Sequence, residues 1–242
     1  WSGFRSHGTL TNMDAGTDWV PSQGRYALDF DGTNDNVTTA SQSLGYAGPQ
    51  FVSMWFNATS ITVANRPTLF SYAQTSGSFL TQMAVGFNII GSGVGNNTGR
   101  LCVIDYSGTA ISGAVSTTDF SSRLNEWVHV CGGWDGARWC VYIDGVDETN
   151  ATGTQDAPTL VNSVFIVLGN SNVSRPFAGK IDDTRWCQGV RLNGSLAKLL
   201  ATRRGIAYEL APRRRSRVSV LTSLRYNIFT GNVGSLEVIG AS

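Results

Sequence analysis

Short runs in which apolar and polar residues alternate recur along the chain, and stretches rich in Gly, Asn and Asp separate them. Alternation with a period of two predicts β-strands, and regular spacing without helical periods predicts an all-β sandwich or jelly roll. The predicted strands are Ala27–Phe30, Phe51–Asn57, Thr68–Tyr72, Gln82–Ile89, Arg100–Asp105, Trp127–Gly133, Arg138–Asp144, Ser163–Leu168 and Gly179–Cys187.

The segment Trp127–Gly145 is the strongest signal in this pattern, because Asp135 and Gly136 separate two alternating runs. Asp-Gly suits a two-residue type I′ turn, which needs positive φ at both central positions. The pairs placed opposite each other by such a turn are Val130 with Val141, Cys131 with Cys140, and Gly132 with Trp139. The segment therefore predicts a β-hairpin.

The two faces of this hairpin differ in character. The face predicted to lie in the core carries Val130, Gly132, Trp139, Val141 and Ile143. The other face carries His129, Cys131, Cys140 and Tyr142. We expect this second face to be the one that the protein presents to its surroundings.

Composition narrows the class of protein. Charged residues make up only 14% of the chain, which is low for a helical protein and ordinary for a β-sandwich. No apolar run approaches the roughly 18 residues that a membrane-spanning helix needs, so we expect no membrane span. Because the chain begins with Trp1 and not with Met, we expect it to be a trimmed product.

The alternating pattern is interrupted near residue 205. Leu196–Arg204 is rich in Leu and Ala, which predicts one short helix, and Tyr208–Arg217 is predicted to be a basic linker. Alternation resumes in Val218–Ile239, which predicts a second hairpin. Residues 1–197 carry ten Lys and Arg against fifteen Asp and Glu, whereas residues 198–242 carry eight against two. We therefore divide the chain into a jelly-roll domain, 1–204, and a basic linker with a C-terminal β arm, 205–242.

Arginines dominate the basic segment, namely Arg203, Arg204, Arg213, Arg214, Arg215 and Arg217. Without interleaved aromatic residues, such a cluster is a poor signal for nucleic-acid binding. We expect the arm to dock on a neighbouring subunit of an assembly, the alternative being a solvated linker.

Several motifs, taken in order, resemble a laminin-G-like domain of the concanavalin A-like lectin/glucanase superfamily. They are Ala27–Val37 (ALDFDGTNDNV), Val52–Trp55, Glu126–Val130, Trp134–Gly136, Val141–Gly145, Val167–Asn170 and Phe177–Arg185. The resemblance covers roughly residues 8–204. The C-terminal extension is similar to those that follow this module in bacteriophage and environmental-bacterial proteins.

The resemblance implies two antiparallel sheets packed face to face. It puts the hairpin in the curved sheet, beside Arg100–Asp105 and Ser163–Leu168, and places Phe51–Asn57 and Gly179–Cys187 in the opposite sheet. The exposed face of the hairpin would then be the surface on which relatives bind ligands. The superfamily includes both lectins and glycosidases, so the fold alone does not decide the function.

A retaining glycosidase needs two carboxylates about 5–5.5 Å apart, often supplied by alternating acids on one strand. The chain has no Glu-x-Asp-x-Glu run, and Asp182 and Asp183 are adjacent, so they point to opposite faces of a strand. With only two histidines, no Ser-His-Asp set is suggested either. We therefore expect a protein that is not an enzyme.

Calcium is the one cofactor that the sequence suggests. Asp31, Asn34 and Asp35 form an oxygen-rich loop that Asp182 could complete, and some relatives bind calcium in loops. The preferred alternative is that these residues form turns by hydrogen bonding to their own backbone.

The four cysteines, Cys102, Cys131, Cys140 and Cys187, lack the spacing of metal ligands. If the two-residue turn is correct, Cys131 and Cys140 are close enough for a disulfide. Cys102 is expected on a neighbouring strand of the same sheet. Four reduced thiols are an equally open alternative.

Four side chains are candidates for ligand binding: Trp134 and Tyr106 as surface aromatics, and Tyr142 and His129 on the exposed hairpin face. Aromatic rings stack on sugar rings, although a Trp beside a turn more often covers the core. Together these features predict a non-catalytic, lectin-like structural or adhesion module on a phage virion surface that contacts glycans. The alternative is an extracellular bacterial carbohydrate-binding module.

Overall fold

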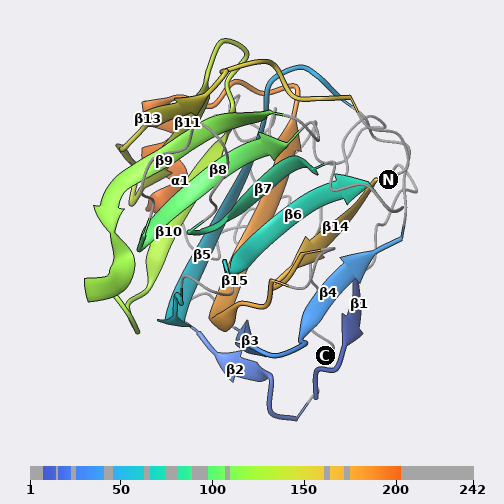
Figure 1. The fold of residues 1–242 in the computed structure, drawn as a ribbon. Helices are drawn as coiled ribbons and strands as arrows, with labels where there is room; N and C mark the ends of the chain where they lie inside the picture. Colours follow the sequence, from blue (N-terminus) through green and yellow to red (C-terminus); the bar gives the residue numbers. More distant parts are fainter. Residues whose placement is uncertain are drawn as a thin grey trace, which may run out of the picture.

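A computed structural model shows two antiparallel β-sheets stacked face to face (Figure 1). The structure describes residues 8–14, 16–22, 26–40, 46–62, 66–74, 81–88, 98–106, 110–160, 164–171 and 175–202. The mostly β, two-sheet sandwich expected from the alternating pattern is confirmed.

The first sheet has eight strands in the order β1-β4-β14-β6-β7-β8-β9-β13. Their bounds are β1 Gly8–Thr11, β4 Asn36–Thr39, β14 Val164–Leu168, β6 Thr68–Gln74, β7 Thr81–Phe87, β8 Arg100–Tyr106, β9 Ile111–Asp119 and β13 Asn150–Gly153. This sheet faces the viewer in Figure 1.

The second sheet has seven strands in the order β12-β11-β10-β5-β15-β3-β2. Their bounds are β12 Val146–Asp147, β11 Trp139–Ile143, β10 Val128–Trp134, β5 Gln50–Ser60, β15 Ala178–Gln188, β3 Tyr26–Asp31 and β2 Trp19–Pro21. The 3₁₀ helix η1, Phe120–Ser122, connects β9 to β10 and so carries the chain from one sheet to the other.

Every one of the nine predicted strands is present in the structure. The strands without a prediction are short or poor in the alternating signal: β1, β2, β4, β9, β12 and β13. In β9, the sequence ISGAVSTTD has small and polar residues at positions where larger apolar residues would produce a visible alternation with a period of two. The predicted helix is present as α1, Gly194–Ala201, and begins two residues earlier than expected because the Asn193 side chain caps it by accepting from the Leu196 N–H.

The β10–β11 hairpin has a four-residue turn, so the predicted register is wrong. Trp134 faces Trp139 at the last pair, and Cys131 faces Tyr142. The Asp135 carboxylate accepts hydrogen bonds from the N–H groups of Ala137 and Arg138, and this side-chain turn lengthens the loop. Because the register moves by two residues, the predicted division of the hairpin into two faces is unchanged.

The expected assignment of strands to sheets is also wrong. The hairpin lies in the sheet of β5, β15 and β3, whereas β8 and β14 belong to the other sheet. Local alternation marks a strand but does not identify its partners, and the crossing at η1 is what places β10 beside β5.

The core lies between the sheets and is filled by large side chains from both. Its aromatic contacts include Tyr72 with Trp186 at 4.6 Å between ring centroids, and Phe56 with Phe87 at 5.6 Å. Such pairs add to the free energy gained from apolar burial. No helix in the described ranges is long and apolar enough to span a bilayer.

Close contact between β10 and β5 depends on Gly133. A Cβ at this residue would overlap the carbonyl oxygen of Gln50 and lie 2.6 Å from the Phe51 Cα. We therefore expect Gly133→Ala to lower the free energy of unfolding by about 2 kcal/mol or more, measured by urea denaturation.

Gly194→Ala is the matched control, because its Cβ would have its nearest neighbour, a Tyr142 ring carbon, at 3.8 Å. We expect this control to unfold within about 0.5 kcal/mol of the wild type. Equal losses in the two variants would show that steric overlap at β5 is not the cause.

Candidate functional site

Helix α1 covers part of the outer face of the seven-stranded sheet. A second, smaller apolar cluster forms beneath it from Phe51, Cys131, Cys140, Tyr142, Cys187, Leu192, Leu196, Ala197 and Leu200. The hairpin face that was expected to meet the surroundings is therefore largely buried.

His129 is 1% exposed and its Nε2 lies 2.9 Å from the Ser53 hydroxyl. Burial, assisted by the positive charge of Arg185, lowers the pKa of His129 to about 4, so the ring is neutral at pH 7. Its ring packs against Trp55 at 5.4 Å between centroids. The expectation that this histidine lies on an accessible surface is wrong, because residues of the sheet itself enclose it.

Trp134 and Tyr142 are also buried. Trp134 is 7% exposed and packs against Trp139 in the main core, with 5.9 Å between ring centroids. Trp134 alternates with Val130 and Gly132 along β10, so its indole lies on the same face of the strand, between the sheets. Tyr142 is 5% exposed in the cluster under α1, and burial is the first cause that raises its pKa to about 12.

All four cysteines are free thiols and all are buried. The suggested Cys131–Cys140 disulfide is absent, since the observed register places Tyr142 and not Cys140 opposite Cys131. Burial raises the pKa of Cys140 and Cys187 to about 12. Cys102 lies on β8 in the eight-stranded sheet, which corrects its expected place beside the hairpin.

The acidic loop after β3 forms turns through its own backbone. One Asp31 carboxylate oxygen accepts from the N–H groups of Thr33 and Asn34, and an Asp35 oxygen accepts from the Asp31 N–H. Asp182 lies elsewhere, at the β15 position that faces Trp55, and accepts from Ser22 at 2.5 Å. The four residues therefore do not fit one calcium site, and the described chain holds no group of three or more His, Cys, Asp or Glu arranged for a metal.

The neighbouring acid, Asp183, is held by Arg185. Two hydrogen bonds of 2.9 and 2.8 Å join the guanidinium to the carboxylate. Asp183 lies in a β-bulge of β15 with φ of +49°, so this pair stabilises an irregular backbone. The carboxylates that were considered for glycoside hydrolysis thus have hydrogen-bonding partners within the fold.

The outer face of the eight-stranded sheet is not covered by an α-helix within the described residues, because α1 packs on the other sheet. The register identifies one row of residues on this face: Thr38, Val167, Ser71, Ala84, Ile104 and Gly113. Val167, Ala84 and Ile104 in this row are each at most 6% exposed. Ser71 is 1% exposed and its hydroxyl has no hydrogen-bond partner.

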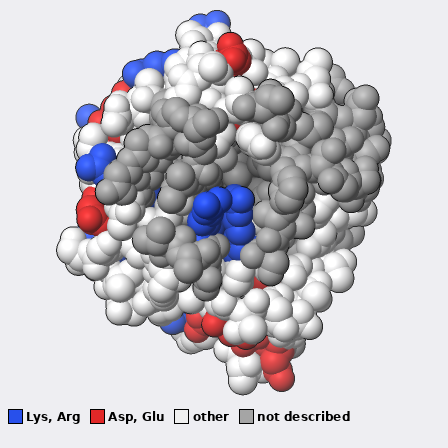
Figure 2. Space-filling view, viewed as in Figure 1, with Lys and Arg blue, Asp and Glu red and all other residues white. Residues whose placement is uncertain are grey.

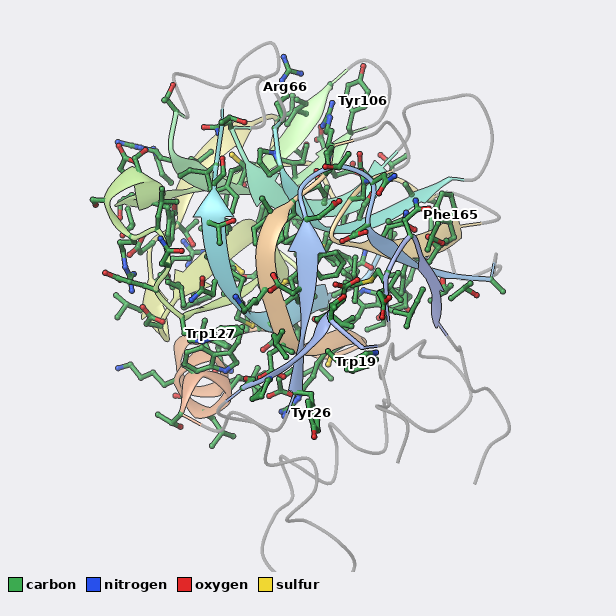
Figure 3. The ribbon with its side chains drawn as sticks, turned by 90° about the horizontal axis from the view of Figure 1, so that it is seen from below. Trp19, Tyr26, Arg66, Tyr106, Trp127 and Phe165 are labelled. Atoms are coloured by element: carbon green, nitrogen blue, oxygen red, sulfur yellow. The ribbon has the colours of Figure 1, made fainter. Side chains whose placement is uncertain are left out.

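Tyr106 ends β8 on this outer face and is partly exposed beside Ile104 and Ile111. It is therefore the one residue of the four ligand-binding candidates whose ring reaches an outer surface. Figure 3 shows it projecting from the same side of the molecule as Arg66.

Arg66 and Arg175 also lie at this sheet, and the sequence analysis did not identify them. Each precedes a proline, which is the only local feature that distinguishes them. Their proximity arises from the pairing of β6 with β14, a contact between distant segments. Figure 2 shows basic atoms gathered at the centre of this face.

The C-terminal arm lies outside the described residues. This applies to Arg203, Arg204, Arg213, Arg214, Arg215 and Arg217, and to the second predicted hairpin. Their docking role stays a prediction from the sequence.

Residues 31–194 match a laminin G family described as the concanavalin A-like lectin/glucanases superfamily. Among curated proteins, none matches the chain in sequence.

Solved structures share the fold. Domain 4 of AbnA, an extracellular arabinanase from Geobacillus stearothermophilus solved with arabinotriose, has a TM-score of 0.58 at 19% identity, covering 80% of this chain and 87% of that one. A heptameric pentraxin from Limulus polyphemus has a TM-score of 0.52 at 16% identity, with 72% and 80% covered. The binding domain of botulinum neurotoxin serotype D has a TM-score of 0.57 at 13% identity, with 83% and 46% covered. These likenesses establish the fold.

The buried thiols lead to a direct prediction. The native protein should react with a thiol reagent such as DTNB slowly and incompletely, and unfolding in urea should release four equivalents, because the thiols are buried and their pKa values are raised. Reduction should leave the mass of the protein unchanged. A gain of two mass units on reduction would contradict the free-thiol arrangement.

Asp105 is a buried carboxyl at the end of β8 and is 3% exposed. One oxygen accepts from the Thr159 hydroxyl at 2.8 Å, and the other has no partner. Burial raises the pKa of Asp105 to about 6. The native state therefore holds this proton more tightly than the unfolded chain does.

Stability should consequently fall as the pH rises from about 4 to 6, where the unfolded chain releases the proton and the native state retains it. Asp105→Asn should remove this loss and gain about 3 kcal/mol relative to wild type across that interval. Urea unfolding of both proteins at several pH values measures the difference, in which the contribution of His129 cancels. A difference that is constant with pH would contradict the raised pKa.

Proposed function

Because the chain belongs to the concanavalin A-like lectin/glucanase superfamily, we propose that it is a non-catalytic carbohydrate-binding module that uses the outer face of its eight-stranded sheet. The observation that carries the proposal is the difference between the two outer faces. Helix α1 covers part of the seven-stranded sheet, whereas the other sheet carries no described helix and ends in a partly exposed tyrosine, Tyr106.

The chemistry of this face suits a saccharide. The partly exposed ring of Tyr106 supplies a flat apolar surface for the C–H groups of a sugar. The arabinanase domain solved with arabinotriose supports the proposal, because it shows that this fold is found with a bound oligosaccharide.

The carboxylates support a binding role over hydrolysis. Asp182 and Asp183 hydrogen bond with Ser22 and Arg185, and Asp105 with Thr159, so each already has a partner in the fold. We therefore assign no catalytic residue. An extracellular location fits this role, and a place on a phage virion, with residues 205–242 as the anchor, is the more specific form of the proposal.

A saccharide array tests the proposal, with arabinotriose among the probes. We expect Tyr106→Ala to weaken binding about two- to tenfold, the range for loss of one aromatic contact. Tyr26→Ala is the matched control, because Tyr26 is 57% exposed on the opposite sheet. Equal losses in both variants would refute the assigned face, and binding of no saccharide would refute the function.

A further inference from the structure

Arg66 and Arg175 are held together by one residue. The Thr68 N–H donates to the Arg175 carbonyl at 3.0 Å, and the Thr68 hydroxyl donates to the Arg66 carbonyl at 3.3 Å. Thr68 is 1% exposed at the start of β6. The backbones of the two arginines are therefore fixed relative to each other and to the sheet.

Further contacts fix each backbone separately. The Arg175 N–H donates to the Asn170 side-chain oxygen at 2.7 Å, and Asn170 is 7% exposed. Arg66 has a φ of +45°, which is uncommon for a residue other than glycine. A conformation of this kind persists only where the surrounding structure imposes it.

The two side chains carry like charges near each other. The pKa of Arg175 is lowered, first by burial and then by the positive charge of Arg66. Arginine side chains are cationic at neutral pH. The ion pairs of the described chain all involve other residues, so no described carboxylate neutralises this pair.

Two partly buried cations without a counter-ion are unfavourable unless an anion joins them. Arg66 projects from the face that carries Tyr106, as Figure 3 shows. A positively charged pair and an aromatic ring therefore lie on one side of the molecule.

We propose that Arg66 and Arg175 together bind the carboxylate or sulfate group of an acidic saccharide on the outer face of the eight-stranded sheet. The planar guanidinium presents paired N–H donors that match both oxyanions. The saccharide part of this inference rests on the proposed function. The anion part rests on the two arginines alone.

The central variant is Arg66→Gln combined with Arg175→Gln, tested by calorimetric titration with polygalacturonate, dextran sulfate and neutral dextran. We expect the wild type to prefer the charged polymers, and the double variant to lose about tenfold or more of that affinity. Whichever charged polymer binds more tightly identifies the anion. Arg138→Gln, which removes one charge from the β10–β11 turn of the opposite sheet, should change affinity less than twofold.

Two further measurements separate recognition from a structural role. Arg66→Lys combined with Arg175→Lys keeps the charge and loses the paired donors, so its affinity should fall between wild type and the glutamine variant. Without any anion, the glutamine variant should be at least as stable as wild type, because it removes like-charge repulsion. Sodium sulfate at constant ionic strength should raise the Tm of wild type more than that of the glutamine variant, because the general stabilising effect of sulfate acts on both proteins alike.

The outcomes separate this inference from the proposed function. Equal affinity for charged and neutral polymers, or equal losses in the double variant and Arg138→Gln, would overturn the anion site and leave saccharide binding intact. Sulfate stabilisation that depends on both arginines, with no polymer or saccharide bound, would keep the anion site and overturn the saccharide. A glutamine variant that is less stable than wild type without anions would show a structural role and overturn the proposal.

Discussion

The central position of β5 is the constraint on which most of this structure depends. It pairs with β10 on one side and β15 on the other, and glycines permit both approaches. At Gly179 of β15, whose φ is +134°, a Cβ would lie 3.0 Å from the Ala58 Cα of β5. At Gly133 of β10, a Cβ would approach the Phe51 Cα of β5 in the same way. These two close contacts hold β10 and β15 against the two edges of β5.

The alternating pattern locates nine of the fifteen described strands and separates the two faces of the hairpin. It was not sufficient to determine the register, because the number of residues in the turn depends on the Asp135 side chain bonding to Ala137 and Arg138. A change of two residues preserves the face of each side chain and alters its neighbours. This is why the core face of the hairpin was predicted correctly, while the partner of Cys131 was not.

The candidate site was less accessible to sequence analysis, for a physical reason. Tyr106 was identified as an aromatic residue near the end of a strand, which is a local property. Arg66 and Arg175 come together only because β6 pairs with β14, and no local pattern contains that information. The expected ligand face was wrong for a related reason: the sequence predicts α1, but not the sheet that it covers.

Helix α1 makes the two outer faces of the sandwich different, because it covers part of only one of them. The described chain ends at Thr202, directly after the helix, on the side of the seven-stranded sheet. Thr202 therefore lies on the opposite side of the sandwich from Tyr106 and Arg66. A support that held such modules by the helix side would leave the Tyr106 side of every copy directed outward.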